Sequence, residues 1–473
     1  MPRSPFLPLL VATLAMGAPL AQAAPAGPVV TTDSGKVEGK VDAGVASWKG
    51  IPFAAPPVGA LRWRAPQRVQ SWSDVRQATA YAADCMQLPF PSDAAPLGTQ
   101  PDEDCLYLNV WKPANAKGKL PVLVWIYGGG FVNGGSSPPT YSGAELAKQG
   151  VVVISFNYRI GRFGFFAHPQ LTREAGHSAP LGNYGFMDQI AALQWIKRNA
   201  AAFGGDPSNV TITGESAGGM SVNFLLTSPQ SQGLFAKAVV MSGGDGGAAP
   251  TPLAGAEKIG QEFAAGKGID RDDPKALDKL RALPAEQVVD GMNLASFRQP
   301  AAAATYHGPF VDGKLALDSG AAFSAGRMHK VPVMIGATSA DIGGKTGYMV
   351  AGARSLAATL AAHGVPVYAY RFSYVADSVA KPGAGAGHAT DIPYFFDTVG
   401  LKYGAQATGK DVAMGKAMAT YMVNFARRGD PNGAGLPAWP RYARSSDQLM
   451  DFAADGKPVA QKDPWGAEID AAR

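Results

Sequence analysis

Short runs of consecutive apolar residues recur along the chain, and each run is bounded by turn-forming residues such as glycine and proline. Apolar runs of this length without alternation are typical of strands that are buried on both faces, as in a parallel sheet. The pattern predicts six such strands, at residues 122–127, 151–157, 210–213, 238–241, 331–337 and 367–372.

Between these strands, apolar residues return at steps of three and four, which is the repeat of an amphipathic helix. The clearest helical segment is 183–203, where Phe186, Ile190 and Leu193 lie on one face. Strands that alternate with helices predict an α/β fold with a mostly parallel central sheet flanked by helices. No internal repeat or Pro/Ser-rich linker divides the chain, so we expect residues 24–473 to form a single domain.

The N-terminus has the three parts of a signal peptide. Arg3 precedes an apolar segment at 6–19, and Ala21-Gln22-Ala23 supplies the small residues that a signal peptidase accepts. We therefore expect residues 1–23 to be removed and the chain to be secreted or periplasmic. No run of 18 or more apolar residues follows, so stable membrane insertion is not expected.

The amino-acid composition limits which partners and bound groups the chain is expected to have. The chain has 42 Lys and Arg residues against 37 Asp and Glu residues, and the basic residues form no dense run. A nucleic-acid partner is therefore not expected, because it would need a basic patch. The two cysteines, Cys85 and Cys105, are expected to form a disulfide in an exported chain. No histidine pair at ligand spacing accompanies them, so no metal site is expected.

The strongest chemical signal is Gly214-Glu215-Ser216-Ala217-Gly218, which lies between the predicted strand 210–213 and a helical segment at 217–226. A serine between a strand and a helix lies on a sharp turn that exposes its hydroxyl, and small residues two positions away allow close backbone packing. The alternative is a glycine-rich turn without chemistry. The flanking strand and helix favour a nucleophilic serine.

A serine hydroxyl needs a base to take its proton, and six histidines are available. Hydrolases with this strand–serine–helix motif place serine, acid and histidine in that order along the chain. His168 and His177 precede Ser216 and are therefore disfavoured. His388 lies in a glycine-rich loop after the strand 367–372 and is the favoured base, and His307 is its main rival.

The acid that orients the histidine should lie near the end of a strand. Asp341 follows the predicted strand 331–337 after a short turn, and it is the favoured candidate. Asp312 is the alternative, although its Asp-Gly sequence is explained equally well by a tight turn. The acid is expected to hold the imidazole in one tautomer and to stabilise the imidazolium.

Three glycines that follow the strand 122–127 are candidates for binding the oxyanion. They form the sequence Gly128-Gly129-Gly130, and their N–H groups, with that of Ala217, would donate to the negative oxygen of an acyl-transfer intermediate. A phosphate-binding loop is the competing interpretation. It is rejected because no Lys-Ser or Lys-Thr pair follows the glycines.

Taken together, these motifs resemble the type-B carboxylesterase family, the group of α/β-hydrolases that includes the cholinesterases. The resemblance extends over nearly the whole mature chain, with matching segments at 48–59, 61–64, 103–111, 203–218, 388–394, 425–432 and 439–442. Several long motifs in the same order are more specific than any one of them.

The resemblance implies a role for each matching residue. Ser216 matches the position of the nucleophile in the family. His388 matches the motif of the catalytic histidine, and this match favours His388 over His307. The other implied roles are oxyanion binding by Gly129, Gly130 and Ala217, buried polar support by Glu215 and Ser242, a disulfide between Cys85 and Cys105, and an ion pair between Arg62 and Glu103.

Two departures from the family pattern concern the site. The acid of the family is usually glutamate, whereas this chain has Asp341, which is one methylene shorter. Only 47 positions separate Asp341 from His388, fewer than is common in the family. The shorter segment predicts a reduced cap region and an open pocket that accepts bulky esters.

The sequence therefore predicts a serine carboxylesterase that hydrolyses small-molecule esters through an acyl-enzyme on Ser216, with no cofactor. One alternative is a related hydrolase of lactones, carbamates or specialised polyester or toxin esters. Another is a non-catalytic binding member of the same fold. The oligomeric state has no signal in the sequence.

Overall fold

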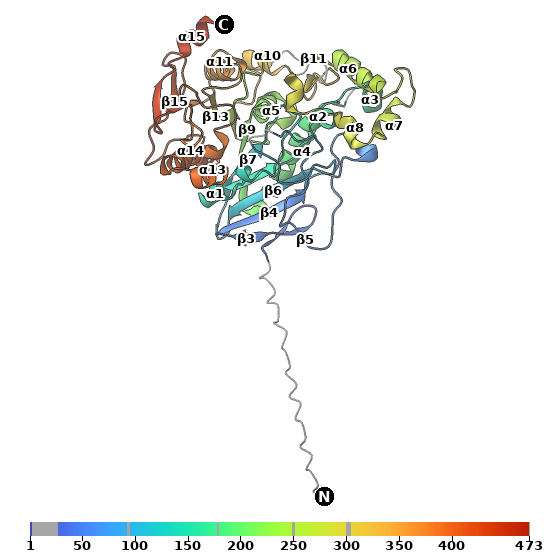
Figure 1. Ribbon diagram of the computed structural model, residues 1–473, viewed down its shortest axis with the longest axis horizontal. Coiled ribbons are helices and arrows are strands. Elements are labelled where there is room, and N and C mark those ends of the chain that lie inside the picture. Colours follow the sequence, from blue (N-terminus) through green and yellow to red (C-terminus); the bar gives the residue numbers. More distant parts are fainter. Residues whose placement is uncertain (2–26, 92–94, 177–178, 248–250, 299–303, 473) are drawn as a thin grey trace.

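In the computed structural model, eleven strands of the described residues form one large sheet (Figure 1). The structure describes residues 1, 27–91, 95–176, 179–247, 251–298 and 304–472. Across the sheet the order is β16 (Pro458–Lys462), β15 (Gln448–Phe452), β14 (Val367–Phe372), β13 (Val333–Thr338), β10 (Lys237–Met241), β9 (Gly205–Glu215), β7 (Leu120–Ile126), β8 (Val152–Phe156), β6 (Tyr107–Pro113), β4 (Val45–Pro52) and β3 (Lys40–Asp42).

The central strands of this sheet, from β15 to β8, run parallel to one another. The outer strands β16, β6, β4 and β3 pair antiparallel with their neighbours. Parallel strands share one carboxyl edge, so residues that follow β9, β10, β13 and β14 can meet there although they are distant in sequence.

All six predicted strands are present, as β7, β8, β9, β10, β13 and β14. Each is buried along most or all of its length, which is why a continuous apolar run predicts it. The outer strands were not predicted, because polar or exposed positions interrupt their apolar runs. In β16, for example, no residue is buried.

Helices cover both faces of the sheet. On one face, α5 (Ala217–Thr227) packs on β9 and β10, α4 (Tyr184–Asn199) packs on β9, and α11 (Tyr348–Ala362) packs on β13 and β14. On the other face, α14 (Gly409–Arg428) packs on β7 and β9, and α1 (Ala144–Lys148) packs on β6 and β8 (Figure 1). The predicted helix at 183–203 corresponds to α4 and the short 3₁₀ helix η3 (Ala200–Phe203) that follows it.

Smaller elements lie around this core. The strands are β1 (Val29–Thr31), β2 (Lys36–Glu38) and β5 (Arg76–Gln77) in one small sheet, and β11 (Thr251–Pro252) and β12 (Phe310–Val311) in another. The helices are α2 (Gly161–Gly164), α3 (Pro169–Ala175), α6 (Leu253–Gly266), α7 (Ala276–Arg281), α8 (Ala285–Val289), α10 (Ser319–Ser324), α12 (Ile392–Phe395), α13 (Val399–Tyr403) and α15 (Gly466–Ala471). The 3₁₀ helices are η1 (Gly59–Leu61), η2 (Pro139–Tyr141), η4 (Pro229–Ser231), η5 (Leu294–Arg298) and η6 (Gly404–Gln406).

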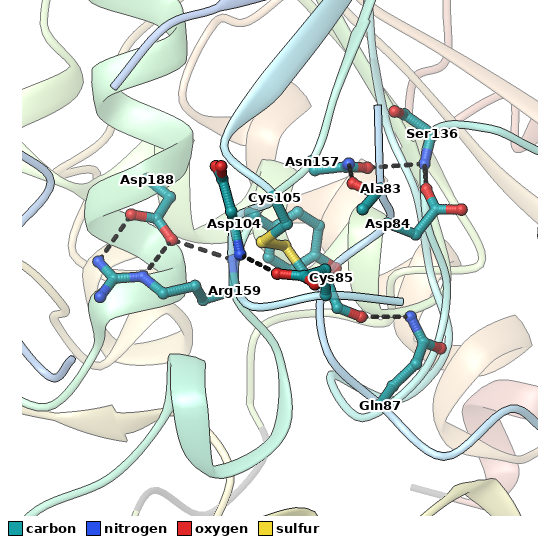
Figure 2. Close-up of a disulfide and its surroundings, with 12 residues drawn as sticks. Ala83, Asp84, Cys85, Gln87, Asp104, Cys105, Ser136, Asn157, Arg159 and Asp188 are labelled. Atoms are coloured by element: carbon teal, nitrogen blue, oxygen red, sulfur yellow. Dashed lines mark hydrogen bonds and ion pairs between the residues drawn. A yellow bond between two sulfur atoms is a disulfide. The ribbon is translucent and has the colours of Figure 1, made fainter. Parts of the chain in front are cut away.

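Cys85 and Cys105 form the predicted disulfide, and both residues are buried (Figure 2). Beside it, the carboxylate of Asp84 accepts hydrogen bonds from the backbone N–H of Ser136 and the hydroxyl of Thr99. The disulfide therefore lies next to the chain segment that continues from the glycine loop after β7. The implied ion pair between Arg62 and Glu103 is also present.

Two sequence-based predictions concern the location of the chain. The predicted signal peptide, residues 1–23, lies outside the described residues apart from Met1. Among the helices of the described ranges, none combines the length and the apolar composition needed to cross a membrane.

Candidate active site

Ser216 lies on the turn between β9 and α5, in a backbone conformation that non-glycine residues rarely adopt. Its φ is 56° and its ψ is −122°. A conformation of this kind costs about 1–3 kcal/mol and persists only where the surrounding structure imposes it. Here the Ser216 N–H donates to the carbonyl of Met241 at the end of β10, at 2.9 Å. The serine is thereby fixed at the carboxyl edge of the sheet.

The glycines around Ser216 are required because neighbouring backbone lies where a side chain would be. A Cβ on Gly214 would lie 2.3 Å from the carbonyl oxygen of Gly218. A Cβ on Gly218 would lie 2.0 Å from the carbonyl oxygen of Ile126 in β7. A Cβ on Gly128 would lie 2.9 Å from the Cβ of Ser216 itself. The glycine loop after β7 therefore packs directly against the serine turn.

The structure brings the three predicted residues Ser216, His388 and Asp341 together in one hydrogen-bonded chain. Nε2 of His388 lies 2.9 Å from Oγ of Ser216, and Nδ1 of His388 lies 2.6 Å from Oδ1 of Asp341. Ser216 is 8% exposed and Asp341 is 4% exposed, so the chain of hydrogen bonds is shielded from bulk water but the serine remains accessible. This geometry allows the imidazole to take the proton of the serine hydroxyl.

Glu215 and Ser242, the predicted support residues, also contact this chain. Oε1 of Glu215 lies 3.3 Å from Nε2 of His388. The hydroxyl of Ser242 donates to Oδ2 of Asp341 at 2.6 Å. The imidazole therefore lies between two carboxylates, and one of them is held by a buried serine.

These charges set the protonation states. Burial lowers the pKa of His388, but the negative charges of Glu215 and Asp341 outweigh it and raise that pKa to about 9. Burial raises the pKa of Asp341, but the hydrogen bond and charge of His388 and the Ser242 hydroxyl together bring it below its ordinary value. Asp341 is therefore ionised at neutral pH, and the site stabilises a positive charge on the imidazole.

Two of the predicted oxyanion donors, Gly129 and Gly130, follow Gly128, which packs against Ser216, and the third, Ala217, is the residue after the serine. Gly129 and Gly130 have φ angles of 103° and 61°, which suit glycine. Within the described part of the chain, the N–H groups of Gly129 and Gly130 donate to no backbone carbonyl. The N–H of Ala217 belongs to the first residue of α5 and has no partner within the helix. Acceptors of the described residues therefore do not occupy these N–H groups.

The two rival residues lie elsewhere. Nδ1 of His307 lies 2.6 Å from the carbonyl oxygen of Gly308, and burial lowers the pKa of His307 to about 4. Asp312 accepts backbone hydrogen bonds from Lys314, Leu315 and Ala316, so it holds its own turn. Neither contacts Ser216 or His388.

Sequence reasoning missed two groups at this site. The hydroxyl of Thr338, the last residue of β13, donates to Oδ2 of Asp341 at 2.9 Å. Asp391 is fully buried and accepts a hydrogen bond from the hydroxyl of Tyr370, and burial together with the charge of Asp341 raises its pKa to about 7. Thr338 is three residues before the acid and Asp391 is three residues after the base, a spacing that could have drawn attention to both.

The segment between Asp341 and His388 contains one helix, α11, and one strand of the large sheet, β14, which are joined by loops. No metal-binding group of three or more His, Cys, Asp or Glu side chains is found among the described residues.

A mostly parallel sheet flanked by helices, with a serine on the tight turn after a central strand, defines the class of the α/β-hydrolases. Comparison with known proteins narrows this class. Residues 26–350 and 345–464 match the model of the carboxylesterase family. The chain belongs to this family, and it is a carboxylic ester hydrolase.

Individual relatives and solved structures agree with the family assignment. The chain is similar to fumonisin B1 esterase of Sphingopyxis macrogoltabida, with 35% identity over 89% of this chain and 86% of that protein. It is also similar to para-nitrobenzyl esterase of Bacillus subtilis, with 33% identity over 92% of this chain and 96% of that protein. A solved structure of a PNB esterase superimposes with a TM-score of 0.82 at 29% identity, covering 94% of this chain and 99% of the other.

Proposed function

We propose that Ser216 is the nucleophile of a two-step acyl transfer, that His388 is its general base, and that Asp341 orients and stabilises the imidazole. The observation that carries this proposal is the hydrogen-bonded chain from the Ser216 hydroxyl through both nitrogens of His388 to the Asp341 carboxylate. The N–H groups of Gly129, Gly130 and Ala217 supply the oxyanion hole.

In the first step, Oγ of Ser216 attacks the ester carbonyl carbon while Nε2 of His388 takes the hydroxyl proton. The carbonyl oxygen becomes an oxyanion and accepts hydrogen bonds from the three N–H groups. The bond to the alcohol oxygen then breaks, and His388 returns its proton to that oxygen, so an alcohol leaves and an acyl-enzyme remains. In the second step, His388 takes a proton from water, whose oxygen attacks the acyl carbon. The bond from that carbon to Oγ of Ser216 then breaks, and His388 returns the proton to Oγ, which releases the carboxylic acid and restores the free serine.

The elements between Asp341 and His388 support a proposal about the substrate class. The segment between Asp341 and His388 adds no helix beyond α11, which supports an open pocket and tolerance of bulky acyl or alcohol groups. The substrate is a small-molecule ester. The mature chain acts after removal of residues 1–23, as one catalytic domain in the periplasm or the medium. The disulfide supports this location, because disulfides persist in oxidising compartments.

The test measures hydrolysis of nitrophenyl acyl esters of increasing chain length and of a para-nitrobenzyl ester by the wild type and by Ser216→Ala. We expect the variant to lose roughly 10⁶-fold in kcat, as is typical when a catalytic serine is removed. Ser446→Ala, which removes a hydroxyl from an exposed residue, is the matched control and should keep full activity. Wild type and Ser216→Ala that hydrolyse every ester equally slowly would contradict the proposal and favour a non-catalytic member of the fold.

A further inference from the structure

The carboxylate of Asp341 accepts hydrogen bonds from several groups in addition to His388. Oδ2 accepts from the hydroxyl of Ser242 at 2.6 Å, the hydroxyl of Thr338 at 2.9 Å and the N–H of Thr338 at 3.2 Å. Oδ1 accepts from the N–H of Ile342 at 2.7 Å and lies 2.6 Å from Nδ1 of His388. Thr338 is fully buried, so its hydroxyl has no water to donate to instead. One residue therefore supplies two of the bonds that fix the direction of the carboxylate.

The next residue, Ser339, connects the acid to the loop that carries the base. Its hydroxyl accepts from the N–H of Ala386 at 2.9 Å, two residues before His388. Its own N–H donates to the carbonyl of Phe372 at the end of β14, at 2.8 Å. The N–H of Ala340 donates to the carbonyl of Ala386 at 2.7 Å, so the two loops are joined at adjacent points.

The loop before His388 has little structure of its own to fix its position. Residues 373–387 contain no helix and no strand of the large sheet, and Gly383 and Gly385 are exposed. Gly385 also lies so close to Ser339 that a Cβ there would lie 2.6 Å from the serine Oγ. Because a proton transfer requires its partners at hydrogen-bond distance, a loop of this kind needs an external attachment.

We propose that Thr338 and Ser339 are positioning residues that keep Asp341 and His388 at hydrogen-bond distance from each other. Thr338 fixes the orientation of the Asp341 carboxylate, and Ser339 fixes the backbone immediately before His388. The two residues, named here the hydroxyl clamp, touch neither substrate nor the Ser216 hydroxyl and act through Asp341 and His388. The inference rests on the catalytic roles proposed above for those two residues.

The first test replaces Thr338 by valine, which keeps the shape of the side chain and removes the hydroxyl. We expect kcat on p-nitrophenyl acetate to fall by roughly tenfold with KM within about twofold of the wild type, because one hydrogen bond to a charged group is lost. Thr338→Ser should restore most of the loss. Thr227→Val removes a buried hydroxyl at the far end of α5 and should change kcat by less than about twofold.

A second measurement separates positioning from a general loss of stability. In the Asp341→Ala background, Thr338 has no carboxylate to orient, so Thr338→Val should have no further effect on kcat. A tenfold loss that persists in this background would overturn the proposal, as would Thr338→Val with wild-type kcat.

Ser339→Ala tests the other half of the clamp and does not open a cavity in the core, since Ser339 is only partly buried. We expect kcat to fall by roughly fivefold with KM unchanged, since one hydrogen bond to the base loop is lost. Wild-type kcat in this variant would overturn the role of Ser339. These results are distinct from a failure of the proposed function, in which the wild type would be no more active than Ser216→Ala.

Discussion

His388 lies between two carboxylates, and this placement governs the pH dependence of the site. Burial lowers the pKa of its imidazole, while the charges of Glu215 and Asp341 raise that pKa to about 9. The base must be neutral to take the Ser216 proton, so kcat/KM should increase as the pH rises towards 9 and His388 loses its proton. The same two carboxylates stabilise the imidazolium that forms during the reaction. The charges that raise the pKa of His388 therefore also lower the activation barrier of proton transfer.

Glu215→Gln separates these two effects. Removal of the negative charge 3.3 Å from Nε2 should lower the pKa of His388 and move the acid limb of kcat/KM to lower pH. The limiting kcat/KM at high pH should fall, because the imidazolium loses a stabilising charge. The measurement is a pH profile of ester hydrolysis, with the exposed Glu286→Gln as a control of equal charge change. An acid limb that stays in place or moves to higher pH would contradict the assignment of Glu215.

At the scale of elements, the unit formed by β9, the serine turn and α5 depends on how closely α5 approaches β7. The carbonyl oxygens of Ile126 and Tyr127 would lie 2.0 Å and 2.8 Å from a Cβ on Gly218. Since these atoms belong to backbone, they cannot move aside as a flexible side chain would. Ala217, whose N–H we propose as an oxyanion donor, directly precedes Gly218, so this packing also fixes the first residue of α5.

Gly218→Ala should therefore destabilise the fold by about 1–3 kcal/mol, the usual cost of adding a methyl group to a filled core. It should also reduce kcat, because α5 has to move away from β7. The free energy of unfolding in urea and the ester activity check both effects. Gly266→Ala, at the end of α6 with no atom near the added Cβ, should be neutral or slightly stabilising. Equal stability of Gly218→Ala and Gly266→Ala would show that the close approach is not required.

At the scale of the whole molecule, the site collects residues from strand ends that the sheet brings to one edge. Ser216 follows β9, Asp341 follows β13, and His388 follows β14. The disulfide lies outside this group, in the chain before β6 (Figure 2). Gln87, two residues after Cys85, connects this region to the chain that follows the glycine loop. Its side-chain amide donates to the carbonyl of Gly134 and accepts from the N–H of Gly134.

Removal of the disulfide should lower stability more than catalysis. Cys85→Ser with Cys105→Ser opens a loop of 20 positions, and the chain-entropy model gives a loss of about 3 kcal/mol. We expect a lower urea midpoint and a kcat within about threefold of the wild type where the variant is folded. Reductant should lower the midpoint of the wild type but not that of the double variant. A wild type that is insensitive to reductant when unfolded would contradict a stabilising role.

Most of the large sheet could be predicted because its central strands are buried on both faces, so their sequences are runs of consecutive apolar residues. β15 and the antiparallel strands could not, because exposed or polar positions break the run, as at Asp451 in β15. The candidate site was predicted in large part, since Ser216, His388 and Asp341 all lie in one hydrogen-bonded chain. Thr338 and Asp391 were missed because a spacing of three residues from Asp341 or His388 does not by itself show that a side chain is buried at the site.

The sequence by itself determined what depends on neighbours along the chain. The turn at Ser216 is one example, because Gly214 and Gly218 are needed two positions away on either side, and the buried strands are another. The family motif already favoured His388 over His307, and only the tertiary structure decided that His388 contacts Ser216. His388 is 172 positions from Ser216, and the strand order, rather than any local pattern, brings the two together. The donors around Asp341 and the raised pKa of His388 were decided in the same way, because charge and burial act through space.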